Sequence, residues 1–217
     1  MRAAALAGGT GLVGGCLLRE LLEEREYGRI VALVRRPMLG WDARVEQRIA
    51  DFENLDAMNG AAVEDLYCAL GTTIAKAGSK AAFRKVDHDY ALSFARWGKA
   101  RGARRFLLVS SVGAGARSSN FYLRVKGELE NDVAALGFES LSIFQPSILV
   151  GVRMEERRGE ALGIRVAVAL QSVLVGPLAK YRPMPAERLA RAMVKQALHA
   201  PPGVARLTFR EIVARSA

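Results

Sequence analysis

The chain of 217 residues is 51% hydrophobic and 25% charged, which is typical of a soluble globular protein with a full core. It has no apolar stretch of about 18 residues, so we expect no membrane span. The net charge of +10 comes from basic residues scattered from Arg2 to Arg215, which favours a soluble basic protein over a nucleic-acid-binding one. The two cysteines, Cys16 and Cys68, cannot form a disulfide framework, so we expect both to be buried and the protein to be cytoplasmic.

The N-terminal stretch ALAGGTGLVGGCLLRELLEE (residues 5–24) allows two interpretations. Arg2, the apolar run after it and VGGC ending at Cys16 resemble a secretion signal. However, Ala3–Ala7 is shorter than the apolar core of such a signal, and the glycines would break its helix. The leucines of LLRELLEE form one helical stripe, which a removed segment does not need. We therefore favour a strand over Arg2–Ala7, followed by a glycine turn and a helix.

Three glycines in this turn, spaced three apart, are typical of a dinucleotide-binding site. Gly8 permits a tight turn, Gly11 lets the backbone approach a phosphate, and Gly14 lets the helix pack closely on the strand. The first N–H groups of the helix would then face the pyrophosphate of the cofactor. The G-x-x-G-x-x-G spacing is a weak signal by itself, so the rest of the chain decides its meaning.

The next strand, predicted over Arg29–Arg36, ends in two arginines. A site for NAD usually carries an acidic residue here, which binds the ribose hydroxyls. A guanidinium group pairs instead with a 2′-phosphate. Arg35 and Arg36 therefore predict NADP(H) as the cofactor, although two arginines can also simply solvate a strand end.

Further strands and helices alternate along the chain. Strands are predicted over Val45–Ala50, Asp65–Leu70, Arg105–Val109, Leu141–Phe144 and Ala205–Thr208. Helices are predicted over about Lys80–Arg101, Phe121–Leu136 and Pro185–Leu198, with a further helical run at Ala161–Leu174. This alternation predicts an α/β fold of the Rossmann type, which is a doubly wound parallel sheet with helices on both faces. We expect one domain over residues 1–217, with a cofactor core of about 1–150 and a small C-terminal substrate-side excursion within 151–217.

Two strand ends carry residues that could line a nucleotide. Asp51 follows the third strand, where its carboxylate could accept a hydrogen bond from the adenine amino group. Leu70 and Gly71 follow the fourth strand, where the glycine would let the chain pass close to the ribose. Aspartate and glycine are also common turn residues at strand ends.

A serine pair and a Tyr-x-x-x-Lys pair follow. Ser110 and Ser111 end a buried strand, and Tyr122 and Lys126 lie four apart on a predicted helix. At that spacing both side chains face the same way. Lys126 would stabilise the phenolate and hold the nicotinamide ribose, while Tyr122 would exchange a proton with a carbonyl or an alcohol. A serine hydroxyl would hold the substrate oxygen. An isolated Tyr-x-x-x-Lys motif is more often structural. Here, however, it follows a glycine turn and a strand that ends in serines, in the chain order that such a site requires.

This ordered set resembles the short-chain dehydrogenase/reductase superfamily, in its extended or atypical branch. LGTTIAKAGSKAAFRKVDHDY (residues 70–90) and SSNFYLRVKGELE (residues 118–130) are similar to the small NADP-binding oxidoreductases related to the human Tat-interacting protein. The resemblance covers nearly the whole chain. It favours Ser111 over Ser110 as the catalytic serine, and it implies a homodimer.

The resemblance also implies a set of cofactor contacts. In chain order these are Thr10, Gly11, Leu12 and Val13 at the pyrophosphate, Arg35 and Arg36 at the 2′-phosphate, Leu70 and Gly71 beside the adenosine or ribose, Tyr122 and Lys126 at the nicotinamide half, and Leu149 and Arg157 over the cofactor.

The sequence therefore predicts an NADP(H)-dependent oxidoreductase in which Ser111, Tyr122 and Lys126 are the catalytic residues. Its substrate would be a small carbonyl or alcohol, because the excursion is short beside those of family members that bind nucleotide sugars. The alternative is a non-catalytic NADPH-binding regulator or sensor that acts through a protein partner. We expect no metal site, since His88 and His199 lack neighbouring ligand types, and no nucleic-acid or membrane partner.

Overall fold

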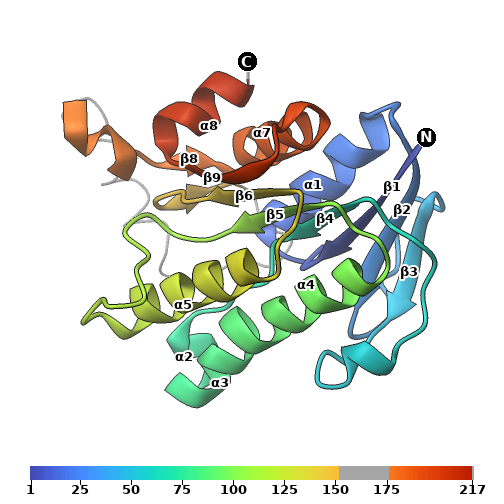
Figure 1. The fold of residues 1–217 in the computed structure, drawn as a ribbon, viewed down its shortest axis with the longest axis horizontal. Helices are drawn as coiled ribbons and strands as arrows, with labels where there is room; N and C mark the ends of the chain where they lie inside the picture. The colour runs from blue at the N-terminus through green and yellow to red at the C-terminus, as the bar shows by residue number, and fades with distance from the viewer. Residues whose placement is uncertain (152–175, 217) are drawn as a thin grey trace.

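The computed structural model describes residues 1–151 and 176–216. Its main feature is a seven-stranded parallel sheet with the order β3-β2-β1-β4-β5-β6-β9. The strands are β1 (Arg2–Ala7), β2 (Tyr27–Val34), β3 (Val45–Ile49), β4 (Asp65–Cys68), β5 (Arg105–Val109), β6 (Ser140–Phe144) and β9 (Gly203–Leu207). This arrangement confirms the predicted Rossmann-type α/β fold (Figure 1). Two expected features, the helical run Ala161–Leu174 and Arg157, lie outside the described residues.

Helices cover both faces of the sheet (Figure 1). On one face pack α1 (Leu12–Glu23), α7 (Ala186–His199) and α8 (Phe209–Ser216), and on the other pack α4 (Tyr90–Ala100) and α5 (Phe121–Ala135). Successive side chains of a strand point to opposite faces. In β1, Leu6 therefore belongs to the first apolar cluster, while Ala5 and Ala7 belong to the second. Burial on both faces explains the continuous apolar run of this strand.

Shorter elements connect these strands and helices along the chain. They are the 3₁₀ helices η1 (Leu55–Ala57) and η3 (Gly176–Tyr181), the helices α2 (Ile74–Ala77) and α3 (Lys80–Arg84), the π-helical turn η2 (Lys85–Asp89), and the paired strands β7 (Leu149–Val150) and β8 (Met184–Pro185). The helix predicted over Lys80–Arg101 is present from Lys80 to Ala100, and the π-helical turn η2 lies within it, between α3 and α4. Within the described ranges, no helix has the length and apolar character needed to cross a membrane.

The order of the strands reverses beside β1, since β2 and β4 pair with its opposite edges. Ligands of such sheets bind at the carboxyl ends of the strands, at the point of reversal. Gly8 follows β1 here and Ala69 follows β4, and a Cβ atom on Gly8 would lie 2.5 Å from the Ala69 carbonyl group. The two strand ends are therefore in contact, and α2, α3 and the start of α5 lie toward the same end of the molecule (Figure 1).

A buried polar cluster joins the opposite, amino-terminal ends of the strands. The fully buried Asp65 carboxylate accepts a 2.7 Å hydrogen bond from the Tyr27 hydroxyl and a 3.0 Å bond from Arg105. Arg2 lies 3.7 Å from this carboxylate, and the hydroxyls of Tyr27 and Tyr67 lie 2.7 Å apart. Burial, followed by the charge of Asp65, raises the pKa of Tyr27, so its phenol stays protonated. The first residues of β1, β2, β4 and β5 are thus tied together at the edge away from the glycine turn.

Candidate cofactor and catalytic site

The glycine turn between β1 and α1 has no room for side chains at two of its glycines. Gly8 has φ of 91°, which favours glycine, and a Cβ atom on Gly14 would lie 2.0 Å from the Gly8 carbonyl oxygen. The Gly11 N–H donates to that same oxygen over 2.9 Å, which closes the turn. Gly11 is the N-cap of α1 and has no side chain to cap it, so the first N–H groups of the helix stay available to an anionic ligand.

The other predicted residues of the turn differ in exposure. Thr10 is exposed, Leu12 is half-buried, and the Val13 side chain is buried in the core. Val13 can therefore meet a ligand only through its backbone. The loop after β2 folds back over the turn, because the Trp41 ring lies 2.9 Å from the position of a Cβ atom on Gly9.

A surface hollow of about 330 Å³ lies where β2 and β3 end. Its lining residues are Arg35, Ile49, Ala50, Asp51, Phe52 and Tyr90. It brings together Arg35 and Asp51, two residues predicted to bind the adenosine half, whereas Arg36 is exposed outside this lining. The Asp51 carboxylate accepts bonds of 2.7 Å from the Asn54 amide group and 3.0 Å from the Glu53 N–H, and these bonds lower the pKa of Asp51. Asp51 is thus both a turn residue and an ionised acceptor beside the hollow.

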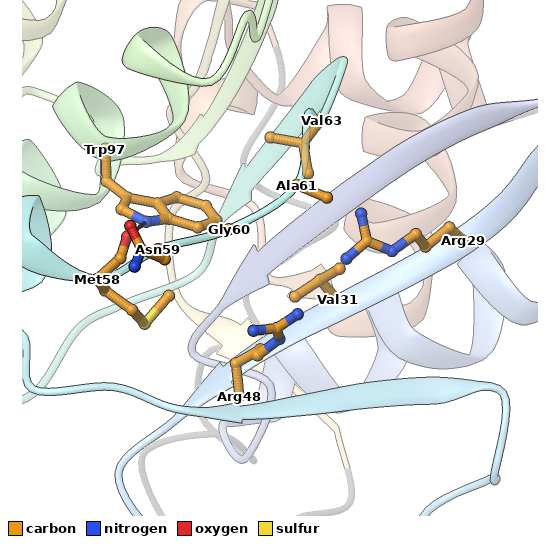
Figure 2. A pocket seen from close by; sticks show the side chains of 9 residues that line it. All are labelled: Arg29, Val31, Arg48, Met58, Asn59, Gly60, Ala61, Val63 and Trp97. Carbon is orange, nitrogen blue, oxygen red and sulfur yellow. Dashed lines mark hydrogen bonds between the residues drawn. The ribbon is translucent and has the colours of Figure 1, made fainter.

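A second cavity lies under α4, at the amino-terminal half of β2, and holds about 10 Å³, the space of roughly one water molecule. Figure 2 shows Trp97 on one side of it and Arg29 and Arg48, from neighbouring strands, on the other. Glu46 pairs with both arginines, at 2.7 Å from Arg29 and 2.5 Å from Arg48. This cavity is too small to hold a nucleotide.

The two serines after β5 have different surroundings. Ser110 is buried and donates a 2.6 Å hydrogen bond to Glu130 of α5. Glu130 also accepts a 2.8 Å bond from Gln145 and pairs with Arg206 at 3.2 Å, so Ser110 belongs to a cluster that joins α5 to three strands. Ser111 is half-buried, and its hydroxyl makes a long 3.5 Å contact with the next carbonyl group. These surroundings favour Ser111 as the serine that meets a substrate.

Tyr122 lies in the first turn of α5 and packs on α3. Its ring centre is 5.5 Å from that of Phe83, which is fully buried, while Tyr122 itself is half-buried. Asn120 caps the helix by accepting a 3.2 Å hydrogen bond from the Leu123 N–H. The chain reaches this cap directly from the end of β5, so Tyr122 lies toward the carboxyl edge of the sheet.

Lys126, one turn further along α5, is buried and forms an ion pair with Asp87 of η2. Its Nζ lies 2.8 Å from Oδ1 of Asp87, and the two side chains are 4% and 1% exposed. The other carboxylate oxygen accepts a 2.8 Å hydrogen bond from the Thr72 N–H. Burial favours the neutral amine, but the charges of Asp87 and then Tyr122 oppose it, and the pKa of Lys126 is raised. Lys126 is therefore held as an ammonium group.

Gly71 lies directly against this ion pair. A Cβ atom on Gly71 would lie 3.4 Å from the Asp87 carboxylate and 3.8 Å from Lys126 Nζ. Leu70 is half-buried and packs on the apolar cluster beneath α4. The loop after β4 therefore meets the Tyr-x-x-x-Lys helix, as a shared site at this edge requires.

The short strand β7 reaches the glycine turn from the other side. Leu149 is half-buried against the cluster that contains α1. Two residues later, a Cβ atom on Gly151 would lie 3.0 Å from the Leu12 side chain. The predicted contact residue Arg157 follows in a part of the chain that lies outside the described residues.

Asp87 is the residue that sequence reasoning missed. Its local pattern, VDHDY, offers several ionisable side chains and no sign of which one turns inward. The structure separates their roles, since the buried His88 bridges Asp89 at 2.8 Å and Asp132 at 2.9 Å. In the ranges that the structure describes, no group of three or more His, Cys, Asp or Glu side chains could hold a metal ion. Both cysteines are buried, as expected.

Known proteins with similar sequences cover most of the chain. Protein HTATIP2 of Rattus norvegicus is 40% identical over 164 residues, which is 72% of this chain and 66% of the rat protein. The chain thus spans just under two thirds of that relative. Protein fmp52, mitochondrial, of Aspergillus fumigatus is 34% identical over 216 residues, which is 94% of this chain and 92% of the fungal protein.

The fold is similar to that of solved sugar-nucleotide epimerases. The UDP-glucuronic acid 4-epimerase of Bacillus cereus, solved in complex with UDP-glucuronic acid and NAD, has a TM-score of 0.68 and 12% sequence identity. The similarity covers 95% of this chain and 77% of the epimerase. At this identity the comparison shows a shared fold.

The cytoplasmic location expected from the two cysteines is wrong. Fungal relatives are named as mitochondrial proteins. Cysteine usage separates oxidising from reducing compartments, and it cannot separate one reducing compartment from another.

The family comparison covers almost the whole chain. The model of the NAD dependent epimerase/dehydratase family matches residues 4–210. Together with the rat relative and the epimerase fold, this match confirms the resemblance to the extended short-chain dehydrogenases/reductases. The chain therefore belongs to the NAD dependent epimerase/dehydratase family.

Proposed function

We propose that this protein is an NADP(H)-dependent oxidoreductase that acts on a small carbonyl or alcohol, with Tyr122 as the acid/base. One observation carries the proposal. The buried ammonium of Lys126 lies one helical turn from the half-buried Tyr122 and against Gly71, at the edge of the sheet where the glycine turn opens. A lysine is seldom fully buried, and a buried charge of this kind beside a phenol is typical of a functional site.

The residues present fit a dinucleotide. The turn at Gly8 and Gly14 excludes side chains from the place where a pyrophosphate would approach, and the uncapped start of α1 supplies N–H donors. Arg35 and Asp51 line the hollow where an adenosine would bind. Arg35 favours NADP(H), because its guanidinium group can pair with a 2′-phosphate. When bound, the cofactor supplies or accepts the hydride.

The side chains would divide the remaining work. In the reducing direction, Ser111 donates a hydrogen bond to the substrate carbonyl oxygen, and Tyr122 donates its proton to that oxygen as the carbonyl carbon gains a hydride. The Lys126 ammonium stabilises the phenolate left behind. In the oxidising direction the same proton returns from the alcohol to Tyr122.

A small substrate is favoured over a nucleotide sugar. Only residues 145–202 lie between β6 and β9, and this excursion is short beside those of family members that bind nucleotide sugars. Less chain is thus present here to enclose a second nucleotide. The homodimer stays a prediction. The names of the fungal relatives favour a mitochondrial location for this protein.

Cofactor preference is tested first. We expect NADPH to bind about tenfold or more tightly than NADH, as one charge-assisted bond would provide. Arg35→Ala should remove this preference. Arg96→Ala, which changes an exposed arginine of α4, should keep it. Equal affinity of the wild type for both cofactors would contradict the assignment of NADP(H).

Turnover is tested with a panel of small aldehydes, ketones and alcohols. Tyr122→Phe should lower kcat by about 100-fold or more, while the protein should still bind NADPH. Wild-type turnover that survives in Tyr122→Phe would refute the role of the phenol. Tight NADPH binding with no turnover of any substrate would favour the sensor alternative over the enzyme.

A further inference from the structure

The loop between β2 and β3, which spans residues 35–44, is held near its start by one side chain. The amide group of Gln47, on β3, accepts a 2.8 Å hydrogen bond from the Met38 N–H and donates a 2.9 Å bond to the Met38 carbonyl oxygen. Among side chains, only the amides of asparagine and glutamine offer a donor and an acceptor in one planar group that does not ionise. Both main-chain polar groups of Met38 are therefore paired, and we call this pair of bonds the Gln47 clamp.

The Gln47 clamp leaves a short span of chain, residues 35–37, between β2 and Met38. The first end of this span is fixed, because the Val34 carbonyl oxygen accepts a 2.8 Å hydrogen bond from the Ala50 N–H. Its middle is restricted, because the ring of Pro37 fixes φ and disfavours the helical region for the residue before it. The backbone of the two arginines in the span is therefore confined before any ligand binds.

The side chains of these two arginines have no protein partner. Arg35 and Arg36 are exposed, and within the described residues neither guanidinium group has a hydrogen bond or an ion pair. In contrast, Arg29 and Arg48 on the neighbouring strands both pair with Glu46. A confined backbone with unpaired guanidinium groups suits the binding of an anion, because the loop is ordered on folding and loses little further freedom on binding.

We propose that Gln47 is a positioning residue that determines the preference for NADP(H): its amide fixes Met38 and so holds the two arginines where the 2′-phosphate binds. The inference rests on the proposed function for the identity of the cofactor. Arg35 lines the hollow assigned to the adenosine, so the span lies at the edge of that hollow. Gln47 acts through the backbone and has no assigned contact with the cofactor. Because NADH lacks the 2′-phosphate, loss of the clamp affects the binding of NADPH alone.

A purely structural role of Gln47 would give a different result. If the clamp only supports the fold, its loss should destabilise the protein or weaken the binding of both cofactors by the same factor. The ratio of the two affinities therefore separates a role in cofactor preference from a role in stability.

The test is titration calorimetry of the full chain with NADPH and with NADH. Gln47→Met, which keeps the length of the side chain and removes both hydrogen bonds, should weaken the binding of NADPH about tenfold and leave that of NADH unchanged. Asn54→Ala is the matched control, because it removes another neutral amide, which donates a 2.7 Å bond to Asp51 beside the same hollow. It should change both affinities by the same factor and keep their ratio. Adenosine 2′,5′-bisphosphate and AMP, which differ only in the 2′-phosphate, should repeat this pattern.

Hydrogen exchange followed by NMR observes the clamp directly. The Met38 N–H of the free wild type should be protected, and Gln47→Met should lose this protection. In the wild type, adenosine 2′,5′-bisphosphate should slow the exchange of this N–H further, whereas AMP should not. If Gln47→Met does not fold, this comparison of the two nucleotides on the wild type decides.

Three results would overturn the proposal. They are an unchanged ratio of affinities in Gln47→Met, an equal loss of affinity for both cofactors, and a wild-type Met38 N–H that exchanges as fast as that of an unstructured peptide or responds equally to both nucleotides.

These outcomes separate the inference from the proposed function. A wild type that prefers NADPH, with a preference that Gln47→Met keeps, would uphold the assignment of NADP(H) and refute the role of Gln47. A preference that Gln47→Met loses, in a protein that turns over no carbonyl or alcohol, would uphold the role of Gln47 and refute the oxidoreductase. Equal binding of both cofactors by the wild type would refute the assignment of NADP(H), and the inference with it.

Discussion

Replacing Asp65 by asparagine tests whether the polar cluster at the amino edge holds the sheet together. The carboxylate is fully buried and accepts from Tyr27 at 2.7 Å and from Arg105 at 3.0 Å. Asparagine offers one acceptor oxygen, so at least one donor loses its partner, and a hydrogen bond to a charged group contributes about 1.5–3 kcal/mol. Arg105 and Arg2 also lose their counter-charge. The free energy of unfolding should therefore fall by about 3 kcal/mol, at the lower end of the range for breaking a buried ion pair.

The assay is urea unfolding followed by far-UV circular dichroism, with thermal unfolding beside it. For a chain of this size the loss corresponds to a fall in Tm of roughly 6–12 °C. Asp42→Asn is the control, since its 2.8 Å pair with Arg44 is exposed and solvent screens it. NADPH affinity should be unchanged, because the cluster lies at the edge opposite the glycine turn. A loss below about 1 kcal/mol, the scale of a surface pair, would refute the reasoning.

Three further predictions concern the site and its surroundings. Gly14→Ala should abolish NADPH binding, because its Cβ would lie 2.0 Å from a backbone carbonyl oxygen, whereas Gly15→Ala has 3.8 Å of space and should bind normally by titration calorimetry. NADPH should quench tryptophan fluorescence, because the Trp41 ring lies against the glycine turn. Trp41→Phe should remove most of that quenching, whereas Trp97→Phe should keep it, because Trp97 is buried between α4 and the sheet. Burial raises the pKa of Cys68 from 9.0 to about 11. The folded state therefore binds a proton that the unfolded state loses above pH 9, and the free energy of unfolding should fall by about 1.4 kcal/mol by pH 10. Chemical denaturation at several pH values should show this fall in the wild type, and Cys68→Ala should reduce it.

The fold was predictable because its signals are local. The apolar run of β1, the glycine spacing and the leucine stripe of α1 each specify a neighbouring element, and the alternation of strands and helices then implies a parallel sheet. The predicted bounds of an element are wrong where contacts between residues far apart in the sequence determine them. β2 begins at Tyr27 and not at Arg29, and the Tyr27 hydroxyl donates to Asp65 on a strand that is remote in sequence.

The sequence predicts the motifs of the candidate site and not what supports them. The spacing of Tyr122 and Lys126 predicts that both face the same way. The partner of Lys126 lies on another element, however, and nothing in VDHDY marks Asp87 as the residue that points inward. The π-helical turn determines which residue of this stretch points inward, and no glycine or proline there predicts such a turn. Likewise, the preference for Ser111 gains physical support only from the bond that engages Ser110 with Glu130. The assignment of one domain stays a prediction.

The π-helical turn makes the site sensitive to the length of the chain between α3 and α4. Each residue of an α-helix turns the chain by about 100°, so a deletion of one residue in η2 would let the segment close as an uninterrupted α-helix and would rotate one side of it by that angle. Asp87 and His88 could then no longer both face α5. A shortening by a single residue, with the glycine turn and the Tyr-x-x-x-Lys pair intact, would thus leave every recognisable motif in place and deprive the lysine of its counter-ion.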